Sequence, residues 1–149
     1  MAIFSCTDCN GCCIDVAAPK KLFISESCCF CGEETEILIA PNQVIAAGTI
    51  LGEITGDANG NGAIPQTYKA FDKDATDGTQ KAKVILKYDT CTDEKGQVTN
   101  WSGIWGCGRN TTKAYVCAKL DARQIVGDIE AARASGMPIR VINGWAYYG

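Results

Sequence analysis

The chain of 149 residues has the size of one ordinary domain, which can bury an adequate core without metal ions or disulfides. Its net charge is −3, and residues 1–36 carry six acidic and two basic groups, so the composition indicates no surface for nucleic acid. The sequence contains no histidine, which removes the commonest general base and the commonest transition-metal ligand. Most hydrolase arrangements therefore lack one of their members.

Membrane and secretion signals are missing from the sequence pattern. No apolar run approaches the roughly 20 residues that a membrane-spanning helix needs. The first residues do not show a charged segment followed by an apolar one, as a secretion signal would. We therefore expect synthesis in the cytoplasm and no membrane partner. Disulfides are normally kept reduced in that compartment, so any oxidation would come later.

Residues 1–36 are expected to form an extended, cysteine-rich N-terminal arm, and residues 37–149 a mainly β (α+β) domain. The stretch TEILIAPNQVIAAGTILGEITG (35–56) is rich in Ile, Val, Leu and Thr, which predicts short strands separated by turns. Pro41 and Asn42 mark one turn. Gly52 within a strand pattern predicts a bulge or a close approach of two backbone segments.

Two polar loops (56–63 and 72–80) flank the short segment TYKAF. The next stretch, KAKVILKYD (81–89), predicts a strand with Val84, Leu86 and Tyr88 on one face. A turn-rich segment with two tryptophans follows, and KAYVCAKL (113–120) predicts a further strand.

A short helical region is predicted within residues 121–136. Asp121 is the expected N-cap, with Gln124 at the capping-box position. Gly127 is unfavourable inside a helix, so the region is expected to divide into two short turns, with Asp128 capping the second. Gly136 is the expected stop. A strand at 138–142 and an aromatic tail complete the pattern, which is mostly β with one late helix.

The ten cysteines allow two kinds of chemistry. Pairs with the spacing Cys-x2-Cys at Cys6/Cys9 and Cys28/Cys31 fit a four-cysteine zinc site. The additional thiols of the arm have no place in such a site and favour disulfides, so both interpretations stay open on spacing alone. The disulfide candidates are Cys6, Cys9, Cys12, Cys13, Cys28, Cys29, Cys31, Cys91, Cys107 and Cys117.

The loop DANGNG (57–62) matches the first half of a calcium-binding EF-hand loop. The twelfth position should be a bidentate Glu, but it is Tyr68 here, and neither flank has a helical pattern. A glycine- and asparagine-rich turn is therefore predicted instead.

Five stretches resemble a known family. These are AAGTILGEITG (46–56), YKAFDKDATDGTQKA (68–82), KVILKYD (83–89), YVCAKLDA (115–122) and GMPIRVI (136–142). In this order they are similar to motifs of the bacteriophage head decoration protein family, typified by the lambda head decoration protein D. The resemblance covers about residues 42–143. Each motif alone is generic, whereas five in register are fairly specific.

The resemblance implies a β-tulip-like domain and a structural role. Family members are cement proteins: homotrimers that sit at three-fold positions on the outer capsid surface and hold the major capsid proteins together against internal DNA pressure. Such a protein would be made in the cytoplasm of a host bacterium and would reside on the virion. The role requires neither catalysis nor a cofactor, so no enzyme is expected.

The arm departs from the family pattern, because the family's arm is short, polar and free of cysteine. In the family the arm binds the capsid by adding a strand to a capsid loop. The apolar arm residues best suited to this role here are Ile3, Phe4, Leu22, Phe23 and Ile24.

A virion persists in oxidising surroundings after assembly, which favours disulfides, each able to contribute about 2–4 kcal/mol. Zinc at Cys6, Cys9, Cys28 and Cys31 is the alternative. The alternative function is accordingly a small zinc-binding or redox-active cysteine protein with a β domain.

Overall fold

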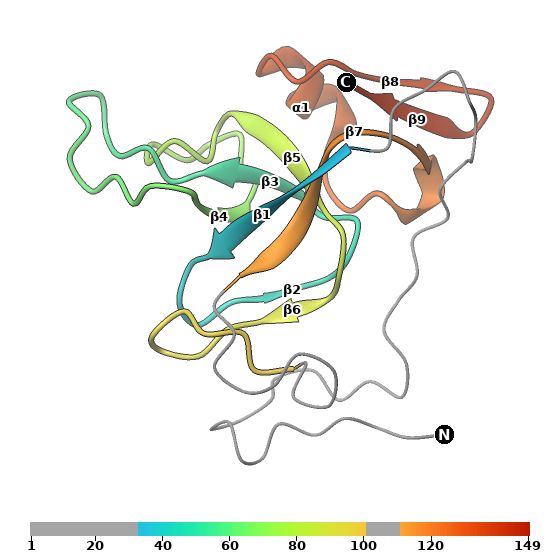
Figure 1. The fold of residues 1–149 in the computed structure, drawn as a ribbon. Coiled ribbons are helices and arrows are strands. Elements are labelled where there is room, and N and C mark those ends of the chain that lie inside the picture. The colour runs from blue at the N-terminus through green and yellow to red at the C-terminus, as the bar shows by residue number, and fades with distance from the viewer. Residues whose placement is uncertain (1–32, 101–110) are drawn as a thin grey trace.

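The computed structural model describes residues 33–100 and 111–149, which form a mainly β fold with one short α-helix (Figure 1). None of the helices in these two ranges is long and apolar enough to span a membrane. The elements are β1 (Glu33–Ile39), β2 (Val44–Ile45), β3 (Ile50–Glu53), β4 (Thr67–Ala70), β5 (Ala82–Leu86), β6 (Thr90–Cys91), β7 (Thr112–Asp121), the 3-10 helix η2 (Ala122–Gln124), α1 (Ile129–Ala134), β8 (Ile139–Ile142) and β9 (Trp145–Tyr148).

Five strands close into a barrel in the order β1-β4-β3-β5-β7, with β7 returning to pair with β1. All neighbours are antiparallel except β1 and β4, which pair in parallel at Leu38–Thr67 and Ile39–Tyr68. Around a closed ring with an odd number of strands the directions cannot alternate throughout, so one parallel pair is a geometric necessity.

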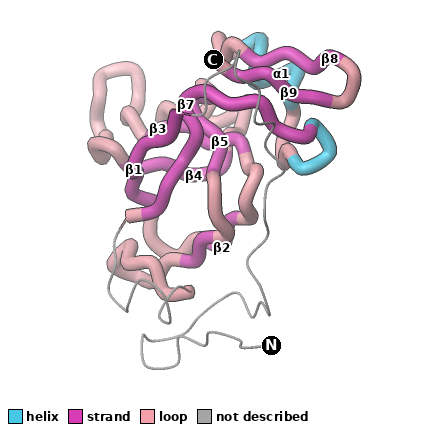
Figure 2. Tube along the Cα trace, turned by 45° about the vertical axis from the view of Figure 1, so that its right-hand side comes forward, coloured by secondary structure: helices cyan, strands magenta, loops and turns pink. Residues whose placement is uncertain are grey.

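Strand β7 is long enough to belong to two structures. Its first part pairs with β1 and β5, and Ala118–Asp121 pair with β9, which forms a hairpin with β8. The hairpin turn is Asn143-Gly144, and both residues have positive φ, as a two-residue turn between twisted strands requires. Figures 1 and 2 show this hairpin beyond one end of the barrel, with the small β2–β6 pair at the other end.

Strands β3, β5 and β7 bury both of their faces. One apolar cluster fills the barrel and includes Leu51, Val84 and Leu86. A second cluster lies outside the same strands, where Ile50 and Ile85 pack with residues of α1, β8 and β9. Burial on both sides explains why VIL in β5 is continuously apolar rather than alternating with polar residues.

The helical region follows the sequence prediction. Gly127 has a φ of 132°, and it separates η2 from α1. The Asp121 carboxylate accepts a hydrogen bond from the backbone of Arg123, and the Asp128 carboxylate accepts one from Ala131, so both predicted caps are present. Gly136 follows the helix with a φ of 114°, as a C′ stop does.

Two contacts fasten the C-terminal elements to β5. The Ser135 hydroxyl, at the end of α1, accepts a hydrogen bond of 3.0 Å from the Ala82 backbone amide. The Tyr148 hydroxyl donates to the Lys83 carbonyl. Burial raises the pKa of Tyr148 to about 12, so this hydroxyl remains a donor at neutral pH.

The strands predicted at 35–56, 81–89, 113–120 and 138–142 are all present. The strand at 33–39 begins four residues before the expected start of the domain at residue 37. Strands β4, β6 and β9 were not predicted. WAYY does not alternate between apolar and polar residues, TYKA is only four residues long, and Thr90-Cys91 is only two residues long.

Gly52 shows both features that its position in the sequence predicted. The β3–β5 register shifts between Leu51 and Gly52, which is an irregularity of the bulge type. A Cβ atom on Gly52 would lie 2.7 Å from the Thr79 Cα atom and carbonyl oxygen and 2.8 Å from the Lys81 carbonyl oxygen. All three are backbone atoms, so a side chain at this position would force two chain segments apart.

The variant Gly52→Ala is expected to lower the free energy of unfolding by about 2–3 kcal/mol through this overpacking, measured by urea denaturation. The control is Gly62→Ala, because a Cβ at Gly62 meets nothing within 4 Å; φ is +85° there, so any loss of stability in this variant reports backbone strain alone. A Gly52→Ala variant as stable as the wild type would contradict the close approach.

Candidate functional site

Most of the arm and thiol candidates fall outside the described residues. These are the eight cysteines Cys6, Cys9, Cys12, Cys13, Cys28, Cys29, Cys31 and Cys107, and the arm residues Ile3, Phe4, Leu22, Phe23 and Ile24. The two remaining cysteines lie in strands: Cys91 in β6 is fully buried, and Cys117 in β7 is half-buried, opposite Glu33. Neither is a free thiol, since both take part in interactions.

Across residues 33–100 and 111–149, no group of three or more Cys, Asp or Glu side chains is placed to hold a metal ion. The loop with the partial EF-hand pattern is a turn, as predicted. The Asp57 carboxylate accepts the backbone amides of Asn59 and Asn61 at 2.9 and 3.0 Å. These hydrogen bonds, that from Asn61 first, hold the pKa of Asp57 below its usual value, so the loop carries a fixed negative charge.

Two of the stretches that carry the family resemblance lie against each other. The loop Asp77-Gly78-Thr79 packs on β3, where Gly52 faces the Thr79 backbone. Gly78 has a φ of +105°, and a Cβ there would lie 2.7 Å from the Glu53 carbonyl oxygen. The Gly56 amide also donates to the Asp77 carbonyl at 2.8 Å. Glycines in both motifs are therefore needed for one contact, which we call the motif junction (Gly52, Glu53, Asp77, Gly78 and Thr79).

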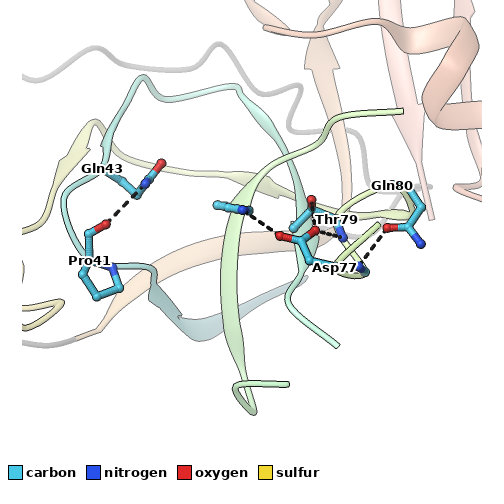
Figure 3. Close-up of polar contacts among 7 residues, drawn as sticks. Pro41, Gln43, Asp77, Thr79 and Gln80 are labelled. Carbon is cyan, nitrogen blue, oxygen red and sulfur yellow. Dashed lines mark hydrogen bonds and ion pairs between the residues drawn. The ribbon is translucent and has the colours of Figure 1, made fainter. Parts of the chain in front are cut away.

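Asp77 holds the junction together by polar contacts. One carboxylate oxygen accepts the Thr79 backbone amide at 3.1 Å and the Thr79 hydroxyl at 2.6 Å, and the other lies 2.7 Å from the Lys69 ammonium (Figure 3). The Gln80 side chain completes the loop by accepting the Gly78 amide. Lys69 first, and then Thr79, hold the pKa of Asp77 well below its usual range.

Comparison with family models, with curated proteins and with solved structures finds no match for this chain.

A second arrangement lies on the outer face of the β7-β9-β8 sheet. Because Ala146 and Tyr148 point into the core, Trp145 and Tyr147 lie on the opposite face. The Lys119 ammonium lies 4.9 Å from the Trp145 ring centroid and 5.3 Å from that of Tyr147. The Arg140 guanidinium lies 5.8 Å from the Tyr147 ring. We call this surface, made of Lys119, Arg140, Ile142, Trp145 and Tyr147, the basic face.

The cations of the basic face contact rings rather than carboxylates in the part of the chain that the structure describes. Within the described part of the chain, neither Lys119 nor Arg140 lies within ion-pair distance of a carboxylate, although both stack on rings. Ile142 beside them is 46% exposed. Next to Tyr147 is a hollow of ≈ 430 Å³ whose lining includes Arg133, Arg140 and the apolar residues Pro138 and Ile139. Such a surface can bind an apolar group that is flanked by carboxylates.

The basic face is not evident from the sequence. Its members come from three strands, and only the register Lys119–Tyr147–Arg140 brings them together. The alternation in Trp145-Ala146-Tyr147, with a small residue between two aromatic ones, was the one local signal available.

Acid is expected to weaken the motif junction. A carboxylate with a lowered pKa in the folded state stabilises the fold above its unfolded pKa of about 4, and loses this contribution as the pH falls through the folded pKa. Asp77→Asn should cost about 1 kcal/mol at pH 7, because the ion pair is partly exposed. It should also make the loss of thermal stability between about pH 5 and pH 2 smaller than in the wild type.

The measurement is thermal unfolding followed by circular dichroism over this pH range. Asp74→Asn is the control, since the exposed Asp74 carboxylate has no ion pair among the described residues. Identical pH profiles for Asp77→Asn and the wild type would contradict the role given to Asp77.

Proposed function

We propose that this protein is a capsid decoration, or cement, protein of a bacteriophage with a tulip-like β domain. It binds the major capsid protein on the outer surface of the virion as a homotrimer at three-fold positions, and stabilises the head against DNA pressure. The role is structural and uses no catalytic residue and no cofactor. The arm that precedes β1 contributes apolar segments, around Ile3–Phe4 and Leu22–Ile24, for strand addition to the capsid.

The motif junction is the observation that carries this proposal. The family resemblance depends on five stretches, and two of them, 46–56 and 68–82, meet through Gly52 and Gly78 at distances that admit no side chain. Residues that must fit each other give a physical reason for the two motifs to occur together. The stretches at 83–89, 115–122 and 136–142 supply β5, β7 and β8, so all five belong to one connected sheet.

The closed barrel also fits a protein that withstands mechanical load. Its first and last strands are joined side by side, and Glu34 of β1 forms ion pairs of 2.6 Å with Lys87 and 3.3 Å with Lys113 where β1 meets β7. The hydrogen bond from Lys87 holds the pKa of Glu34 below its usual value, so the carboxylate remains charged at neutral pH. Closure leaves no sheet edge within the barrel itself.

Binding to capsids tests this proposal directly. The purified full-length chain should be trimeric by light scattering, and should occupy the three-fold positions of undecorated capsids in electron micrographs. Leu22→Asp/Phe23→Asp should lower the occupancy without changing the trimer, because the arm would no longer present an apolar strand. Lys95→Ala, in an exposed turn, is the control. A wild-type chain that leaves the three-fold positions empty would refute the proposal.

The thiols are tested separately. If disulfides reinforce the particle, decorated capsids should shift on non-reducing gels and should lose thermal stability with a reductant, by about 2–4 kcal/mol per bond. Peptide mapping without reduction would identify the pairs. About one zinc ion per chain, with no shift caused by the reductant, would instead assign Cys6, Cys9, Cys28 and Cys31 to a metal site.

A further inference from the structure

Charge is separated between two ends of the described chain. Residues 53–80 carry five acidic and two basic groups, whereas residues 113–149 carry five basic and three acidic ones. The loops of the first segment and the β8–β9 hairpin of the second lie on opposite sides of the barrel in both Figure 1 and Figure 2. Each molecule therefore carries an acidic end and a basic face on opposite sides of the barrel.

The acidic end also carries an apolar projection. Ala63, Ile64 and Pro65 are all exposed at the loop between β3 and β4, and Ile64 is 45% exposed. Asp57 lies in the same loop. The neighbouring loop adds Asp72 and Asp74, both exposed. The hydrogen bond from the Gly56 amide to the Asp77 carbonyl ties the two loops together.

This projection is held in place before any partner binds. The Ile64 amide donates to the Ile54 carbonyl at 3.0 Å, and the Ile64 carbonyl accepts from Thr67. The Gln66 amide donates to the Glu53 carboxylate at 3.1 Å. A fixed conformation loses little entropy on binding, so an apolar tip of this kind suits a contact surface.

The hollow at the basic face is complementary to this projection. Its volume of ≈ 430 Å³ accommodates an isoleucine side chain, and its lining combines Pro138 and Ile139 with Arg133 and Arg140. Arg133 is already paired with Glu130 at 2.7 Å, so Arg140 is the cation of the lining that is open to a carboxylate. An apolar tip with carboxylates around it would therefore meet an apolar floor with cations around it. Attraction between the carboxylates around the tip and the cations around the hollow would also fix the orientation of one copy relative to the next.

We propose that the apolar tip at Ile64 of one copy binds the hollow beside Arg140 of the next copy. The inference rests on the proposed trimer and names the two surfaces that form it. Because the surfaces differ and lie on opposite sides of the molecule, the contact is head to tail, and a rotation that closes after three copies gives a ring in which both surfaces of every copy are used.

The test measures the mass of the full-length chain by light scattering and sedimentation. Ile64→Glu and Arg140→Glu should each convert the trimer to a monomer, with unchanged circular dichroism, since both side chains are exposed. Val44→Glu is the matched control, because Val44 is 59% exposed on β2, outside both surfaces, and this variant should remain trimeric.

Charge-reversal variants distinguish the loss of the contact between two copies from a loss of folding. Lys119→Glu/Arg140→Glu and Asp72→Lys/Asp74→Lys should each be monomeric, and the chain that carries all four changes should recover the trimer. Trimers in both Ile64→Glu and Arg140→Glu would overturn the inference, and so would a four-fold variant that is folded but monomeric. If such variants also decorate capsids normally, the proposed function stands. A wild-type monomer that binds no capsid overturns both.

Discussion

The pairing of β7 with three other strands is the interaction on which the rest of the structure depends. Its first half closes the barrel between β1 and β5, and its second half carries the β8–β9 hairpin. Because β3, β5 and β7 are covered on both faces, the barrel core and the outer cluster share the same strands. A change in β7 would therefore affect the barrel, the hairpin and the basic face together.

Local chemistry made part of this fold predictable. The strand at 81–89, the division of the helical region at Gly127 and the cap at Asp128 follow from propensities of neighbouring residues, and all three are present. Gly52 was informative because only a missing side chain allows the Thr79 backbone to approach. Barrel closure was not predictable in this way. The β1–β7 pairing joins Glu33 to Cys117, and no short-range pattern encodes a contact over that separation.

The two candidate surfaces also differ in how far the sequence predicts them. The acidic loops at 56–63 and 72–80 were visible in the sequence as polar loops, and Asp57 folds back on its own backbone as a turn residue does. The basic face required the register of three strands, since Lys119, Tyr147 and Arg140 are aligned only across β7, β9 and β8. Sequence order places Lys119 twenty-one residues before Arg140. The unequal charges of residues 53–80 and 113–149 produce two separate charged surfaces only because the fold places these segments on opposite sides of the barrel.

The return of β7 to β1 also has a consequence for the order of events during synthesis. Strand β1 leaves the ribosome first, yet its main partner residues, Thr112–Cys117, are made some eighty residues later. Among the described residues, Leu38 and Ile39 pair earlier, with β4. At about 5–20 residues per second, Glu33–Ile37 wait for several seconds before their partners in β7 are made. Closure of the barrel is thus a late, long-range step, and β1 is exposed to wrong pairing until β7 has been made.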